Sequence, residues 1–126
     1  MRPNLREDGW ELDSALARHR KSPATFEIPS DEERAQVQVG DMVKLLFLFD
    51  EDWPDSEGEG RAGEPLVSCE RMWVTTTRVT EAGYEGRLES LPRTTDVIRP
   101  GERVSFQSDH IASIFIPETD QRRAPP

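Results

Sequence analysis

Apolar residues near the N-terminus follow a helical periodicity. Between positions 10 and 22 they recur at spacings of three and four residues, the pattern of one buried helix face. Acidic residues come early in this stretch and basic residues late, which suits the helix dipole, and Pro23 ends the pattern. We therefore expect an N-terminal helix over residues 10–22. Its apolar face consists of Leu12, Ala15, Leu16 and His19.

Downstream of Gly40 the pattern becomes extended. Val43, Leu45, Phe47 and Phe49 alternate, and apolar residues also occupy positions between them. A run of this kind is typical of a strand that is buried on both faces. We therefore expect a largely buried strand here.

Four further β-rich runs follow, separated by turn residues, at 71–80, 84–90, 103–107 and 110–116. Short strands with glycine at the corners favour a strongly curved sheet. We therefore predict an α+β chain that is mostly β, with a β core over 40–116 behind the N-terminal helix. Its sheet should be a small, strongly bent antiparallel sheet or an SH3-like barrel of about five strands.

Two local signals add detail. Ser30 followed three residues later by Glu33 predicts a capping box and a short helix, because the serine hydroxyl and the glutamate carboxylate can each accept a backbone N–H. Gly86 lies inside a strand-like run, which indicates a bulge or a close approach of two backbones.

Charge divides the chain unevenly. The 126 residues suit one domain, 1–126, with a frayed tail at 117–126, and they carry a net charge of −9. Eight acidic and two basic residues between Met42 and Glu70 give that segment a net charge of −6. Most of these acids lie in 50–65, a Gly- and Pro-containing stretch that we expect to be a mobile loop.

The acidic loop has three interpretations. It is a solvated loop, a weak cation site, or a contact surface for a basic protein partner. An EF-hand starting at Asp50 fails, because its fifth position is Pro54 and its twelfth is Arg61. Trp53 fits an anchor to the protein body or to a partner. The candidate contact residues of the loop are Trp53, Asp50, Asp52, Asp55, Glu57 and Glu59.

Several classes of protein are disfavoured. An acidic chain lacks the basic footprint that nucleic-acid binding needs, and no run of about 18 apolar residues could cross a membrane. A single cysteine and an N-terminus without an apolar signal region predict a cytoplasmic protein. The sequence contains no G-x-S-x-G, phosphate-binding glycine loop or H-E-x-x-H, so we expect no catalytic residues, metal or cofactor.

Three further residues could form a binding surface. Trp73 lies in a strand-like run between Met72 and Val74, so it faces either the core or solvent, where it could anchor a peptide or ligand. Tyr84 and His110 could line a pocket with it, although a structural role, in which the ring bonds to backbone, is favoured for His110.

The order of motifs from Gly9 to Ile116 resembles a bacterial family. The most specific part is Glu70-Arg71-Met72-Trp73-Val74 followed by Gly86-Arg87-Leu88 and Pro92. Together with the motifs at 9–12, 25–29, 40–45, 101–106 and 110–111, these residues resemble the uncharacterised bacterial YegJ-like domain. This family has no established activity, and related small domains lie near toxin-immunity genes, so the resemblance implies an immunity or inhibitor role. Ser90-Leu91 before Pro92 and the insertion at 50–65 depart from the family pattern.

Two functional hypotheses follow. The first is a non-enzymatic protein-binding module, of the immunity or inhibitor type, that attracts a basic partner by electrostatic steering. The alternative is a small-molecule or metabolite sensor with Trp73, Tyr84 and His110 around an apolar pocket. A hydrolase is a third reading, and it would need His110, Cys69 and carboxylates to converge.

Overall fold

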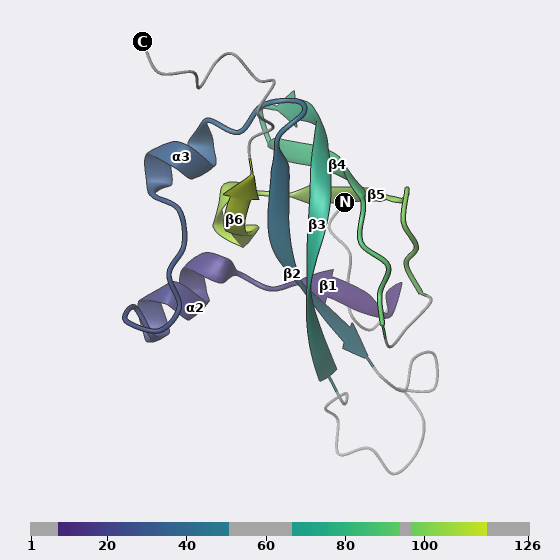
Figure 1. Ribbon diagram of the computed structural model, residues 1–126, viewed down its shortest axis with the longest axis horizontal. Coiled ribbons are helices and arrows are strands. Elements are labelled where there is room, and N and C mark those ends of the chain that lie inside the picture. The colour runs from purple at the N-terminus through teal and green to yellow at the C-terminus, as the bar shows by residue number, and fades with distance from the viewer. Residues whose placement is uncertain (1–7, 51–66, 94–96, 116–126) are drawn as a thin grey trace.

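The computed structural model describes residues 8–50, 67–93 and 97–115 (Figure 1). Antiparallel strands dominate it, as the sequence predicts. They form one six-stranded sheet in the order β1-β2-β3-β4-β5, and β6 also pairs with β2. The strands are β1 (Trp10–Leu12), β2 (Met42–Asp50), β3 (Val67–Thr80), β4 (Gly83–Leu88), β5 (Arg103–Phe106) and β6 (Ile111–Phe115). The helical elements are α2 (Ala15–Lys21), α3 (Asp31–Ala35) and the 3-10 turn η2 (Ser108–His110).

β2 organises the sheet. One of its edges pairs with β3 along its whole length. Its other edge is shared, because β1 pairs with Phe47–Phe49 and β6 pairs with Met42–Leu45. Two strands therefore lie along one edge of β2, and the sheet is curled into a half-barrel with β2 and β3 as its long strands (Figure 1).

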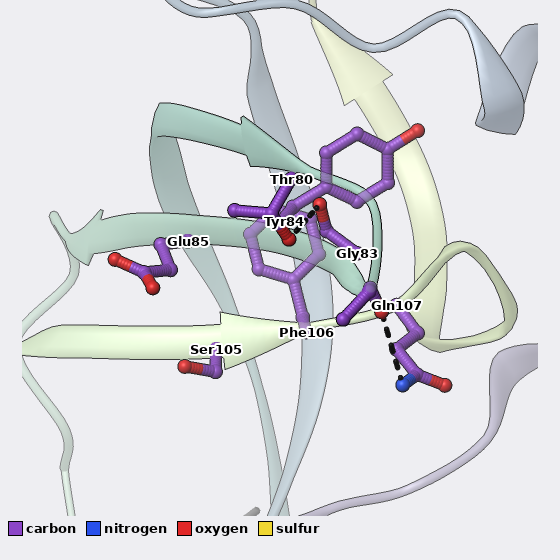
Figure 2. Close-up of a pocket in the computed structure, with 8 residues that line it drawn as sticks. Thr80, Gly83, Tyr84, Glu85, Ser105, Phe106 and Gln107 are labelled. Carbon is purple, nitrogen blue, oxygen red and sulfur yellow. Dashed lines mark hydrogen bonds between the residues drawn. The ribbon is translucent and has the colours of Figure 1, made fainter. Parts of the chain in front are cut away.

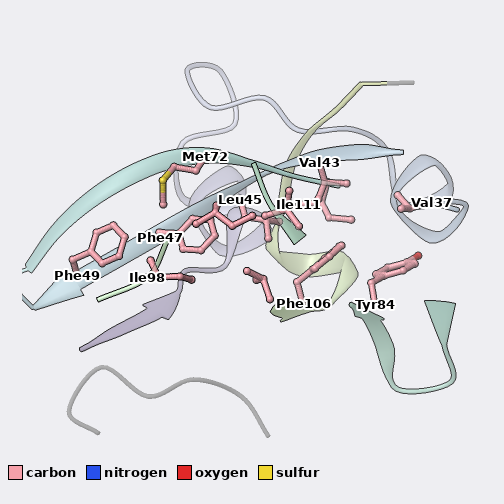
Figure 3. Close-up of a cluster of buried hydrophobic side chains, with 13 residues drawn as sticks. Val37, Val43, Leu45, Phe47, Phe49, Met72, Tyr84, Ile98, Phe106 and Ile111 are labelled. Atoms are coloured by element: carbon pink, nitrogen blue, oxygen red, sulfur yellow. The ribbon is translucent and has the colours of Figure 1, made fainter. Parts of the chain in front are cut away.

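The strand β2 is largely buried, as predicted: its inner face is fully buried, and its outer face is buried at Leu46 and half-buried at Met42, Lys44 and Leu48. Alternate residues of this strand, from Val43 to Phe49, point into the half-barrel and join the main core (Figure 3). Leu46 points to the other side of the sheet and is fully buried there against Ala15 and Ala112. The sheet therefore has an inner face lined by the core and an outer face that α2, with Phe26 and Ile28 after it, covers around Leu46.

The predicted helix over 10–22 is wrong in its first turn. Trp10–Leu12 is a strand, in which Trp10 pairs with Phe49 and stacks on Phe47 at a centroid distance of 5.5 Å. The helix α2 begins only at Ala15, because the Ser14 hydroxyl accepts a hydrogen bond from the N–H of Ala17 at 3.0 Å. Pairing with β2 outweighs the helical spacing because it adds Trp10 and Leu12 to the core.

The short helix α3 confirms the predicted capping box. The Ser30 hydroxyl accepts from the N–H of Glu33, and the Glu33 carboxylate accepts from the N–H of Ser30. Arg34 of this helix is buried, and its guanidinium donates to the carbonyls of Pro29 and Ser108 at 3.1 Å. These bonds fasten α3 to η2.

Strand boundaries differ from the prediction in small ways. β3 begins at Val67, before the predicted 71, because β2 pairs with it as far as Asp50. Asp50 therefore belongs to β2 and not to the expected loop. The last strand begins at Ile111, because His110 closes η2. The rest of the expected acidic loop and the tail at 117–126 lie outside the described residues.

Candidate binding surface

Trp73 lies on the outer face of the sheet and is half-buried there. Its neighbours Met72 and Val74 point into the core. Lys44 pairs directly with Trp73 across β2 and β3, and its ammonium lies 4.8 Å from the centre of the indole ring. The ring of Phe115 meets Trp73 edge-on at 6.5 Å and is 51% exposed. The sequence left open whether Trp73 faces the core or solvent. In the structure it faces outward and forms an aromatic pair with Phe115 at the surface.

Charged side chains surround this aromatic pair on the same face. Directly paired residues of antiparallel strands share a face, and so do residues two apart along a strand. Thr75 lies two residues from Trp73 and pairs with Arg87 of β4, which in turn pairs with Arg103 of β5. We call this surface the outer patch. Its members are Lys44, Trp73, Thr75, Arg78, Glu85, Arg87, Glu89, Arg103 and Phe115.

Hydrogen bonds order part of the outer patch. Glu89 accepts from the Thr75 hydroxyl at 2.5 Å and from the Arg87 guanidinium at 3.0 Å. The Thr75 bond first and Arg87 second hold the pKa of Glu89 below its usual value. Glu85 lies 4.0 Å from Arg103, whose side chain is 78% exposed. Each of these two arginines, Arg87 and Arg103, therefore has a carboxylate beside it, and the side chain remains more than half exposed.

A second feature is a surface hollow on the β3–β4 hairpin (Figure 2). It has a volume of about 220 Å³, and the stacked rings of Tyr84 and Phe106, 5.2 Å apart, form part of its wall. The Thr80 hydroxyl donates to the carbonyl of Gly83, and the Gln107 amide donates to the carbonyl of Ala82. These polar groups of the hollow thus bond to the protein itself.

Trp73, Tyr84 and His110 do not gather at one pocket. Tyr84 lines the hollow, whereas Trp73 faces the other side of the sheet. His110 is buried, and its Nδ1 accepts from the N–H of Gln107 at 2.9 Å, which closes η2. The ring therefore serves the backbone, one of the two roles that the sequence left open.

The acidic candidates are only partly placed. Asp50 is the last residue of β2. Trp53, Asp52, Asp55, Glu57 and Glu59 lie outside the described residues. Within 8–50, 67–93 and 97–115, no three His, Cys, Asp or Glu side chains are grouped to hold a metal ion. The helices in these ranges are also too short and polar to cross a membrane.

Of the nine members of the outer patch, sequence reasoning named only Trp73 as a candidate and missed the other eight, among them Lys44 and Phe115. Lys44 is the one charged residue between Met42 and Phe49. A charge at that position indicates that the strand face carrying it opens to solvent nearby. Phe115 is the exposed last residue of β6, and only the pairing of β6 with β2 brings it to Trp73.

Comparison of the chain with protein-family models, with curated proteins and with solved structures finds no match.

The hydrogen bond of Tyr84, a residue that lines the hollow, gives a first test of stability. The hydroxyl of Tyr84 donates to the carbonyl of Arg34 at 2.8 Å in a buried setting. Tyr84→Phe should lower the free energy of unfolding by about 1–2 kcal/mol, because a buried carbonyl loses its donor. Urea unfolding measures this loss. The control Thr77→Val removes an exposed hydroxyl that donates to the Glu85 carbonyl, and should change stability by under about 0.5 kcal/mol. Equal losses in the two variants would contradict the role of the Tyr84 bond.

Proposed function

We propose that this chain is a non-enzymatic protein-binding module and that the outer patch is its contact surface. The observation that supports this most is the Trp73–Phe115 pair, an aromatic pair on the outer face in which the Phe115 ring is 51% exposed. Tryptophan and arginine are the residues that most often dominate binding energy in protein interfaces. A half-buried indole fixed by Lys44 gives a partner a rigid apolar anchor.

The proposal also covers the family, the biological role and the cellular location of the module. We propose that it is an immunity or inhibitor protein of the cytoplasm, of YegJ-like kind, with an SH3-like version of the observed half-barrel. The motif order from Gly9 to Ile116 supports the YegJ-like part, and the inhibitor role depends on it. The basic partner expected from the acidic segment also stays a prediction, because Asp52–Glu59 lies outside the described residues.

A small-molecule sensor is the second candidate, and the hollow beside Tyr84 favours it. Aromatic walls with hydroxyl and amide groups at the rim suit a small polar ligand. Protein binding is preferred because two polar groups of the hollow, on Thr80 and Gln107, already bond to the hairpin backbone.

Affinity capture from the source cell's lysate tests the proposal. The bait is the full chain as wild type or as the double variant Trp73→Thr and Phe115→Thr. Both sites are on strands, where threonine is well tolerated. The matched control is Val79→Thr, which removes another exposed apolar residue of β3, 50% exposed, outside the outer patch.

A protein held by wild type and by the control, but lost from the double variant, supports a binding module that uses the outer patch. A protein held equally by all three baits overturns the role of the patch, and capture of nothing by any bait overturns the binding module. A fourth bait with Asp52, Asp55, Glu57 and Glu59 changed to Asn and Gln tests the acidic segment. Loss of a basic protein from that bait would confirm the expected basic partner, and its retention would contradict it.

A further inference from the structure

The charge of the outer patch is opposite in sign to that of the chain. The patch contains four basic side chains and two acidic ones, whereas the whole chain carries −9. Its basic members are Lys44, Arg78, Arg87 and Arg103. A local positive surface on an acidic protein favours contact with negative groups at short range, where nearby charges outweigh distant ones that salt screens.

Two arginines of the patch face each other. Arg87 of β4 pairs directly with Arg103 of β5, and their side chains are 53% and 78% exposed. Like charges directly opposite on neighbouring strands destabilise a sheet. Glu89 and Glu85 each approach one of these arginines from the side, at 3.0 and 4.0 Å. The two guanidiniums therefore keep donors for a further carboxylate, which guanidinium binds with good geometry.

The arginines lie next to the aromatic pair. Arg87 pairs with Thr75, which is two residues from Trp73 on the same face. Such diagonal neighbours are about 7–8 Å apart. A single short segment of a partner can therefore reach Arg87 with a carboxylate and the Trp73–Phe115 pair with an apolar side chain.

We propose that the outer patch binds an acidic segment of a partner protein, with carboxylates on Arg87 and Arg103 and an apolar residue on Trp73 and Phe115. This inference rests on the proposed function and adds the chemistry of the partner. It concerns residues other than those of the acidic segment 50–65, for which a basic partner is predicted.

A single-stranded nucleic acid would also supply negative groups and rings, but the observations favour protein. The ring of Trp73 already has Lys44 over one face and the ring of Phe115 beside it at an interplanar angle of 73°. A base needs an open ring face for stacking. A long polyanion is also repelled at a distance by a net charge of −9, which a short acidic segment feels less.

Fluorescence anisotropy with synthetic probes tests the inference on the full chain. The probes are a short peptide of glutamates around one phenylalanine, the same peptide with lysines in place of the glutamates, and an oligouridine of similar length. The variants are Arg87→Gln with Arg103→Gln, and the control Arg20→Gln. Arg20 loses the same charge from an exposed position of α2, outside the patch.

We expect the glutamate peptide to bind wild type more tightly than either other probe, and more weakly as salt rises. The double variant should weaken this binding about fivefold, from two exposed ion pairs, and Arg20→Gln by less than about twofold. Equal binding of the double variant and wild type overturns the inference, as does preference for the lysine peptide. Tighter binding of oligouridine would make the patch a nucleic-acid surface. If the lysate partner still requires Trp73 while the glutamate peptide does not bind, the proposed function stands and only this inference fails.

Discussion

Replacing Phe47 by alanine should lower the free energy of unfolding by about 3–5 kcal/mol, the range for truncating a buried aromatic side chain. Phe47 is fully buried in β2, with Trp10 on one side at 5.5 Å and Phe49 on the other at 6.2 Å. The change removes the middle ring of three and leaves a cavity that the paired strands cannot close, because β1 and β3 hold the β2 backbone on both edges. Urea unfolding followed by tryptophan fluorescence measures the loss.

Phe115→Ala is the matched control for this prediction. Phe115 is also a strand phenylalanine with an aromatic neighbour, but it is 51% exposed. Its truncation should cost less than about 1 kcal/mol, because little apolar area is removed from contact. If Phe115→Ala destabilised the protein as much as Phe47→Ala, the outer patch would belong to the structural core and would be unsuited to binding a partner.

The inner face of the sheet thus stabilises the fold, whereas the outer face is the one proposed to bind a partner. The inner face holds the large rings that stabilise the half-barrel, among them Phe47, Phe49 and Phe106. On the outer face, α2 and the residues Phe26 and Ile28 that follow it cover the region around Leu46. The described remainder of this face contains the aromatic pair and the opposed arginines, and the arginines add little stability because they are exposed like charges on neighbouring strands. Residues that add little stability and expose apolar area are expected where a protein meets a partner.

Much of the fold was predictable because β2 and its neighbours follow strong local rules. The alternation of Val43, Leu45, Phe47 and Phe49 required a buried inner face, and Leu46 required a second one. Ser30 and Glu33 form their capping box because all of its partners lie within one turn. A prediction such as this capping box holds because all of its hydrogen-bond partners are close in sequence and no distant contact has to supply one.

The outer patch could not be predicted, because it depends on which strands become neighbours. The sequence around Trp73 is apolar on both sides, so it does not choose a face. The choice follows from the register, which pairs Trp73 with Lys44 and Val74 with the buried Val43. The strand at Trp10–Leu12 was missed for the same reason: a three-residue strand forms only because the edge of β2 is available.

At Gly86, by contrast, a single residue of the sequence did indicate a contact between two strands. A glycine inside the run 84–90 predicted a bulge or a close approach, and the structure has both. The pairing of β3 with β4 shifts register between Thr76 and Arg78, beside Gly86. A Cβ added to Gly86 would lie 2.4 Å from Cγ1 of Val74 and 2.6 Å from the carbonyl oxygen of Thr75.

Gly86→Ala should therefore lower the free energy of unfolding by about 3 kcal/mol, the upper end for an overpacked core, because the Thr75 carbonyl is backbone and cannot turn aside. Without these contacts the same change would stabilise the protein by about 0.4–1 kcal/mol through the unfolded chain. Urea unfolding of Gly86→Ala, alone and with Val74→Ala, measures the effect. In the double variant the side-chain clash is gone and the backbone clash remains, so the two losses should sum to more than the loss of the pair. A stabilised Gly86→Ala variant would show that β3 and β4 can separate at the bulge, and that the outer patch lies on a flexible sheet.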